Sequence, residues 1–457
     1  MDKKNLWSIR RKELFDVDKF AEEYKLFISR CKTERECVAE FVEYAKAKGF
    51  KDLKDVIAKG ETLVPGSRVY AQHMGKTLML YVVGTEDIEA GMNITGAHID
   101  SPRLDLKPNP LYEDSDLALF ETHYYGGIKK YQWVAIPLAL HGVVCKRNGE
   151  TIPVTIGESP KDPVLGVSDL LIHLAQKQMD KKAKEVIDGE DLNAMAGSIP
   201  VEGEEKDAVK KHILNILSEK YNFDEKDFLS AELTLVPAGP ARDYGIDRGM
   251  IMAYGQDDRV CAYPAVRAIT ELGTPRHTCA CVLTDKEEIG SIGATGAESR
   301  FFENSVAELM FAMGQYSELK LRRVLQNSQM LSADVTAAFD PNYPETMEKN
   351  NCAYAGHGLA FNKYCGAGGK FSSSDANAEF IARIRRIMDD ANVNYEISEL
   401  GRVDVGGGGT IAYVMGNYGM DVIDCGVPVF NMHAPWEICS KIDLYETRKG
   451  YGAFYEY

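Results

Sequence analysis

Two stretches of the chain, residues 94–100 (ITGAHID) and 278–288 (TCACVLTDKEE), decide the fold. Each begins as a short apolar run and ends in histidine or carboxylate residues. Similar apolar runs occupy residues 78–83, 330–335 and 422–429, and helix-like segments such as 375–388 lie between them. Short apolar runs that alternate with helical patterns predict an α/β protein with a mixed sheet flanked by helices.

One helix is predicted in detail. Residues 33–49 (TERECVAEFVEYAKAKG) place Val38, Phe41, Val42 and Ala45 at helical spacing. The segment opens with Thr-x-x-Glu, the pattern of a capping box, and closes on a glycine. We therefore expect an amphipathic helix that packs one face on the core.

The overall composition excludes some classes of protein. The chain has 457 residues, 69 of them acidic and 53 basic, for a formal charge of −16. That balance argues against binding to nucleic acid or to an anionic membrane surface, because both need clustered Lys and Arg. With 45% hydrophobic and 27% charged residues, the chain has the composition of a soluble globular protein.

Targeting signals also bear on the class of protein. The first residues lack the apolar region of a secretory signal, and no apolar stretch reaches the ~20 residues that span a bilayer. The ten cysteines are scattered without a C-x-x-C pair. Reduced, buried thiols and a cytoplasmic location are the expectation.

The length points to more than one domain, because a single core rarely grows beyond about 250–300 residues. Between Leu104 and Pro240 the sequence changes character. A tyrosine-rich turn (124–127) and a strand-like run are followed by the charged tract 176–211. We interpret this middle part as an inserted second domain.

Residues able to do chemistry stand where the apolar runs stop. In an open α/β sheet the carboxyl ends of the strands form the ligand-binding edge, so side chains placed there converge from distant parts of the chain. The residues that follow the runs are His98, Asp100, Glu287, Glu288, Asp334 and His433.

Mixed histidine and carboxylate ligands are typical of catalytic zinc sites. Two metals about 3.5–4 Å apart would also need a bridging carboxylate. The best candidate is Asp257 in the stretch GQDDR (255–259), directly before an apolar helix. Its neighbour Asp258 could instead be a simple helix cap.

Five ordered motifs resemble those of the aspartyl aminopeptidase family of dinuclear zinc peptidases. The resemblance spans almost the whole chain. The motifs are AHIDSPRLDLKP (97–108), GQDDR (255–259), TDKEEIGSIGATGAES (284–299), SADVTAAFDPNY (332–343) and NMHAPWE (431–437).

The resemblance implies a role for each residue at the strand ends. His98 and Asp334 become terminal ligands, Asp257 the bridge, and Glu288 and His433 further ligands. Glu287 becomes the general base, and Asp100 the partner that orients the imidazole of His98. The peptide bond after the bridging aspartate is expected to be cis.

The implied cofactors are two divalent metal ions per subunit. Zinc is the first choice, and cobalt or manganese could use the same donors. The implied reaction is hydrolytic removal of the N-terminal residue from peptides with a free α-amine.

The family architecture also implies a domain division. Residues 1–105 and 240–457 would form the catalytic domain, and residues 106–239 an inserted, mainly β dimerisation domain. The expected assembly is a dodecamer built from dimers. His173, in the segment 166–174, is the candidate for a histidine that reaches the substrate of the neighbouring subunit.

The preferred N-terminal residue stays open. Family members that prefer acidic residues carry a histidine where this chain has Asp340. Lys370 and Arg402 could still supply positive charge to an acidic side chain. The resemblance thus favours acidic residues, whereas Asp340 and the charge of −16 favour neutral or basic ones.

Two other hypotheses fit parts of the pattern. The chain could be another two-metal amidohydrolase, such as a carboxypeptidase or deacylase. It could also be a non-catalytic assembly or cargo protein that kept the fold, although such a protein would be expected to have lost a ligand or the base, and none is missing.

Overall fold

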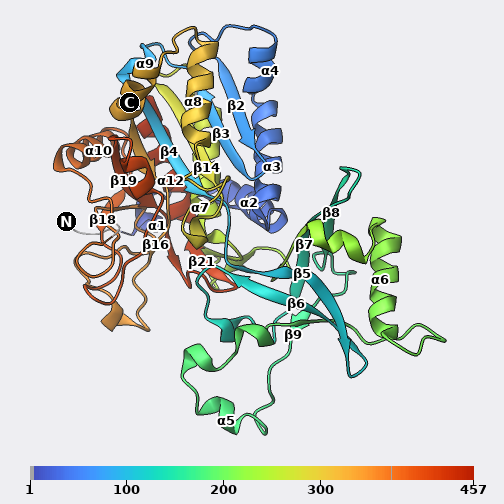
Figure 1. Ribbon diagram of the computed structural model, residues 1–457. Coiled ribbons are helices and arrows are strands. Elements are labelled where there is room, and N and C mark those ends of the chain that lie inside the picture. The colour runs from blue at the N-terminus through green and yellow to red at the C-terminus, as the bar shows by residue number, and fades with distance from the viewer. Residues whose placement is uncertain (1–4, 372) are drawn as a thin grey trace. The chain divides into compact units, whose positions relative to one another are not determined.

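The computed structural model describes residues 5–371 and 373–457, which form two compact units (Figure 1). The first unit contains the chain up to Asp100, Ala241–Met432 and Glu437–Tyr457. The second contains Ser101–Pro240 together with the short segment His433–Trp436. Within the described ranges, no helix is long and apolar enough to cross a membrane.

A nine-stranded mixed sheet organises the first unit, as the sequence predicted. Its spatial order is β1-β2-β3-β14-β4-β15-β19-β17-β18. The strands are β1 (Lys51–Asp52), β2 (Arg68–His73), β3 (Thr77–Val82), β4 (Met92–His98), β14 (Thr278–Thr284), β15 (Gln329–Ser332), β17 (Leu359–Asn362), β18 (Tyr395–Ser398) and β19 (Asp421–Gly426).

The centre of this sheet is parallel. Strands β14, β4, β15 and β19 run in one direction, with Thr284 opposite His98 and Ser332 opposite Gly96. Parallel neighbours end at the same edge of a sheet. The residues that follow β14, β4 and β15 therefore meet, although they are far apart in sequence.

Helices cover both faces of the sheet. The larger core cluster joins one face to α2, α3, α7, α10 and α12, and the second cluster joins the other face to α4, α8, α9 and α11. The helices of the first unit are α1 (Leu6–Ile9), α2 (Leu14–Arg30), α3 (Glu34–Ala47), α4 (Leu53–Ala58), α7 (Gln256–Glu271), α8 (Phe301–Ala312), α9 (Glu318–Asn327), α10 (Ala378–Asp390), α11 (Ala412–Gly416) and α12 (Lys441–Glu456).

The burial of strand β14 on both faces explains its continuous apolar run. Cys279, Cys281 and Leu283 pack in the first cluster, whereas Ala280 and Val282 pack in the second. A strand buried on both faces needs a continuous apolar run rather than an alternating one. The predicted helix at residues 33–49 is α3, and its capping box between Thr33 and Glu36 is confirmed.

Two predicted strands are each divided in the structure. The run 422–429 becomes β19 and β20 (Pro428–Phe430), and the run 330–335 ends at Ser332 before β16 (Thr336–Ala337). Strands β20 and β16 join β12 (Arg242–Tyr244), β13 (Met250–Ala253) and β21 (Glu437–Ser440) in a second, five-stranded sheet. Gly426 marks the division, because a Cβ there would clash with the carbonyl group of Asp334.

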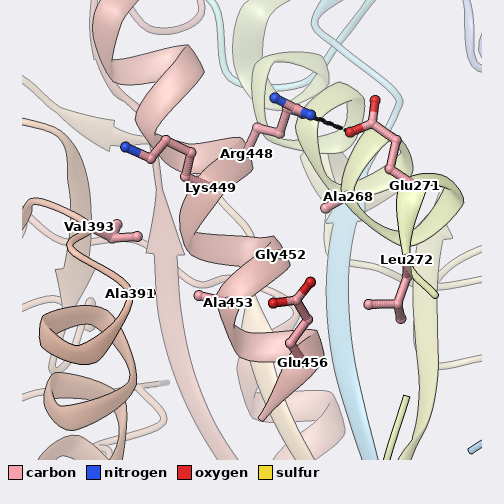
Figure 2. Close-up of a pocket in the computed structure, with 10 residues that line it drawn as sticks. All are labelled: Ala268, Glu271, Leu272, Ala391, Val393, Arg448, Lys449, Gly452, Ala453 and Glu456. Carbon is pink, nitrogen blue, oxygen red and sulfur yellow. Dashed lines mark hydrogen bonds and ion pairs between the residues drawn. The ribbon is translucent and has the colours of Figure 1, made fainter. Parts of the chain in front are cut away.

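The C-terminal helix α12 packs beside α7. Arg448 of α12 binds Glu271 at the end of α7 (Figure 2). A surface pocket of about 380 Å³ lies against this face of α12, over the small residues Gly452 and Ala453. Arg448 and Glu271 are among the charged residues that line this pocket. Glu271 is the last residue of α7, whereas Asp257 lies at the start of the same helix.

The second unit is mainly β, as predicted for the insertion. Its seven strands are all antiparallel, in the order β8-β7-β11-β5-β6-β10-β9. The elements are β5 (Arg103–Asp114), β6 (Leu117–Tyr125), β7 (Leu138–Cys145), β8 (Thr151–Ile156), β9 (Gly166–Val167), β10 (Ala194–Gly197), β11 (Ala231–Pro237), α5 (Gln176–Met179) and α6 (Ala208–Tyr221). Its first and last long strands pair, with Leu104 opposite Leu235.

Candidate metal centre

Three neighbouring parallel strands deliver the donors of the candidate centre. His98 is the last residue of β4, Asp334 follows β15, and Glu287 and Glu288 follow β14 in a short 3-10 turn. Asp257 lies at the start of α7. The structure thus brings together five residues that the sequence analysis singled out, all from the first unit.

His98, Asp257 and Asp334 form the tightest group. One ligand atom from each lies within 4.8 Å of the others, and His98 Nε2 is 3.1 Å from Asp257 Oδ1. Glu287 Oε2 is 3.9 Å from the same imidazole nitrogen. His98 and Asp257 are buried, so the donors face one another in a site largely shielded from water.

Asp100 connects two segments of the centre. Its backbone carbonyl oxygen is 3.1 Å and its Oδ1 3.3 Å from His98 Nδ1, which leaves Nε2 directed at Asp257. The same carboxylate accepts the backbone N–H groups of Glu287 and Glu288, each at 3.2 Å. The sequence predicted only the contact with the imidazole, and the contacts with the two backbone N–H groups are seen in the structure alone.

The segment that carries Asp257 is also fixed. The Asp257–Asp258 peptide bond is cis, as expected from the resemblance. The backbone N–H of Asp257 donates to Glu437 Oε2 at 3.0 Å, and the Gln256 side chain donates to the Glu437 carbonyl oxygen at 2.7 Å. Glu437 is buried, and its contact with the Asp257 segment was not predicted from the sequence.

The electrostatics of the centre favour a bound cation. Burial raises the pKa of the Asp334 carboxyl well above its ordinary value, and the nearby charge of Asp258 adds to the rise. Burial alone would lower the pKa of His98, but hydrogen bonds to Asp100 and Asp257 raise it well above its usual range. Carboxylates crowded in this way hold their charge more readily when a divalent cation is present.

The donor set fits zinc. One imidazole nitrogen and two carboxylate oxygens converge, and the second imidazole nitrogen is held by a carboxylate and a carbonyl group. Zinc sites of hydrolases use this combination of ligands and of supporting hydrogen bonds.

The remaining predicted site residues are His433, His173, Lys370 and Arg402. His433 belongs to the second unit, where its Nδ1 is 2.8 Å from the Gly127 carbonyl oxygen. His173 is exposed in a turn before α5, also in the second unit. Lys370 and Arg402 line one pocket of about 220 Å³ in the first unit.

Within that pocket, both cations have local partners. Lys370 Nζ is 3.0 Å from Asp375 Oδ2 and 3.7 Å from the centre of the Tyr364 ring. Arg402 Nη1 donates to the Glu345 carbonyl oxygen at 3.1 Å. Asp340 is not among the lining residues, and its carboxylate accepts the backbone N–H of Asn342 instead.

A parallel sheet edge that carries a buried histidine and several carboxylates defines the class of metal-dependent hydrolases. Comparison with known proteins then identifies the family. The family model described as aminopeptidase I zinc metalloprotease (M18) matches residues 27–455, so the chain belongs to this family.

Individual relatives agree with that assignment. A probable M18 family aminopeptidase 1 of Clostridium acetobutylicum is 58% identical over 453 residues, which cover 99% of this chain and 97% of the relative. The crystal structure of an M18 aminopeptidase of Thermotoga maritima superposes with a TM-score of 0.95 at 45% identity, over 100% of this chain and 99% of that one. The predicted function, a zinc-dependent aminopeptidase, is confirmed.

A more distant structure shares the fold. The S. cerevisiae mApe1 dodecamer superposes with a TM-score of 0.77 at 21% identity, over 97% of both chains.

Proposed function

We propose that the chain uses two divalent metal ions to remove the N-terminal residue from peptides. His98 and Asp334 would be terminal ligands, and Asp257 would bridge. The observation that carries the proposal is that His98 and Asp334, at the ends of parallel strands, converge within 4.8 Å with Asp257 at the start of α7. The resemblance of the motifs adds Glu288 and His433 as further ligands of the two ions.

The chemistry divides between the ions and the chain. When bound, zinc would polarise the scissile carbonyl and lower the pKa of water. Glu287 would take the proton of the attacking water and pass it to the leaving amine. Asp100 would support both roles, because it holds His98 in one tautomer and fixes the backbone of Glu287.

The substrate side chain would enter the pocket lined by Lys370 and Arg402. Gly406 lines this pocket, and four residues later the hydroxyl of Thr410 donates to Asp424 of β19 at 2.6 Å. Two cations would favour an acidic N-terminal residue. Their partners within the chain, above all Asp375, would reduce that preference, so neutral residues would also be accepted.

The second unit would be the dimerisation domain of a dodecamer. Leu170, Leu171, Ile172 and Leu174 are all exposed in one segment of this unit. Apolar side chains gathered on a surface are typical of a contact between proteins. His173 stands in the same segment, so it would reach the substrate of a neighbouring subunit.

A cytoplasmic location is also proposed. The ten cysteines all lie in the described part of the chain and form no disulfide, and nine of them are buried. Free thiols persist in a reducing compartment.

A substrate panel tests the proposed function. Purified protein is loaded with Zn²⁺ or Co²⁺ and tested on aminoacyl-p-nitroanilides with acidic, neutral and basic residues, with and without a chelator. We expect chelator-sensitive hydrolysis and a loss of turnover when the α-amine is acetylated. Cleavage of acetylated substrates would indicate a deacylase or carboxypeptidase, and no hydrolysis of any substrate would indicate a non-catalytic assembly protein.

A further inference from the structure

Arg259 is a buried cation that the roles described so far do not use. It lies two residues after Asp257 in the first turn of α7, and its side chain is 0% exposed. In the part of the chain that the structure describes, it forms no ion pair with a carboxylate. Because an unpaired buried charge is costly, its position calls for an explanation.

The guanidinium group binds two backbone carbonyl groups. Nε donates to the Ile99 oxygen at 3.2 Å, and Nη2 donates to the Lys32 oxygen at 3.1 Å. Ile99 stands between His98 and Asp100. Arg259 therefore ties the segment that carries Asp257 to the segment that carries His98, 159 residues earlier.

The aromatic ring of Tyr254 supports the guanidinium group. The centre of the ring is 5.5 Å from the Arg259 guanidinium carbon and 5.7 Å from Lys32 Nζ. Tyr254 precedes Asp257 by three residues, so both sides of the Asp257 segment are packed. Contacts of a cation with an aromatic face are more stabilising when both are removed from water.

The planar shape of the Arg259 guanidinium group determines how it connects the two segments. A guanidinium group presents donors in a rigid plane, so two bonds to different carbonyl groups fix both direction and distance. A lysine carries the same charge on a flexible stem and cannot reproduce this fork. Replacement of Arg259 by lysine therefore separates a role of geometry from a role of charge alone.

We propose that Arg259 is a positioning residue that holds the Asp257 segment at metal-binding distance from His98. The inference rests on the proposed metal centre, because it assigns both residues as ligands. Without the fork, the two segments would lose a direct connection next to the 3.1 Å contact between His98 Nε2 and Asp257 Oδ1. The metal site would then be less well formed before the ion arrives.

The test compares Arg259→Met, Arg259→Lys and a matched control, Arg267→Met. Arg267 lies eight residues later on the same helix and binds Glu23 and Glu271, so its loss also removes charge and hydrogen bonds from α7. Zinc-free proteins are titrated with Zn²⁺ against a chromophoric chelator, and the visible spectrum of bound Co²⁺ is recorded. Circular dichroism shows whether each variant is folded.

We expect Arg259→Met to weaken Zn²⁺ affinity by about 10- to 100-fold, the range for residues that orient metal ligands, and to change the Co²⁺ spectrum. Arg259→Lys should recover only part of the affinity, and Arg267→Met should keep the wild-type value. Wild-type affinity in Arg259→Met, or an equal loss in the control, would overturn the inference.

The lysine variant keeps the test decisive if Arg259→Met does not fold. Full wild-type affinity and an unchanged Co²⁺ spectrum in Arg259→Lys would also reject a positioning role. A failure of the proposed function is recognised separately, because it would appear in the wild-type protein as an absence of Zn²⁺ binding or of hydrolysis.

Discussion

The side chain of Asp100 binds the backbone of Glu287, with Oδ1 accepting the N–H group at 3.2 Å. The same oxygen is 3.3 Å from His98 Nδ1, and Oδ2 accepts the N–H group of Glu288. One buried carboxylate thus fixes the proposed base and two proposed ligands. Replacement of Asp100 should therefore disturb the centre without removing any ligand.

Asp100→Asn is expected to lower Zn²⁺ affinity by about 10- to 100-fold and to lower turnover with it. The amide nitrogen of the asparagine cannot accept a hydrogen bond, so one of the two backbone N–H groups would lose its acceptor. Competition with a chromophoric chelator measures the affinity. Asp443→Asn is the control, because Asp443 is equally buried and accepts the N–H groups of Gly356 and Gly358 away from the centre. An equal loss of affinity in both variants would contradict a specific role for Asp100.

Glu287→Gln should retain its metal while turnover falls by about 10²- to 10⁴-fold, because the amide cannot accept the proton of the attacking water. Metal analysis and steady-state kinetics check both parts. Glu288→Gln is the counterpart and should lose metal, since a ligand oxygen is replaced. If the two variants show the opposite pattern, the two glutamates have been assigned in the wrong order.

His173→Ala is expected to lower turnover by about 10²-fold, the usual loss when one donor to a reacting carbonyl is removed. Metal content and the mass of the assembly should not change, which metal analysis and light scattering establish. His123→Ala is the control, because His123 is another exposed histidine of the second unit. Wild-type kinetics in His173→Ala would remove the proposal that this residue reaches a neighbouring active site.

The pH dependence of stability should show the titration of Asp285. Burial and the nearby carboxylates of Glu34 and Asp100 raise the pKa of Asp285 to about 6. In an unfolded chain an aspartate has a pKa of about 3.9. The folded protein therefore retains a proton that the unfolded chain has lost, and this contribution to stability, complete below pH ~4, disappears as the pH rises through about 6.

Asp285→Asn removes this titration and keeps an oxygen for the Thr295 hydroxyl, which donates to Asp285 at 2.6 Å. Between pH 4 and 7, the free energy of unfolding of the wild type should fall relative to the variant by on the order of 2–3 kcal/mol. Urea denaturation of the zinc-free proteins measures this difference. Parallel pH profiles would show that Asp285 titrates normally in the folded protein.

The sequence predicts the centre well where residue type and strand end coincide. The runs that end at His98 and Thr284 are β4 and β14, and both are buried on two faces. Such strands produce continuous apolar runs, so their ends are easy to recognise. The division of the run 422–429 was missed, because it depends on the close approach of Gly426 to Asp334, a contact between distant parts of the chain.

Glu437 and Arg259 were missed for a related reason. Both were quoted as the last residues of their motifs, NMHAPWE and GQDDR, without a role. Their roles depend on contacts with Asp257 and Ile99, which are 180 and 160 residues away along the chain. A single sequence does not reveal such pairs. The only hint of these roles in the sequence was that each motif ends in a charged residue, beside a segment that is buried in the fold.

The pairing of Leu104 with Leu235 has a consequence for how the protein folds during synthesis. The proposed ligands His98 and Asp257 are separated by residues 101–240 of the second unit, and closing so long a loop costs conformational entropy. Antiparallel partners have Cα atoms roughly 4.5–5.5 Å apart, so the folded insertion already holds its two ends together. Once residues 101–240 have folded on the nascent chain, Asp257 is joined to His98 by a much shorter effective loop, and the entropic cost of bringing the two ligands together is smaller.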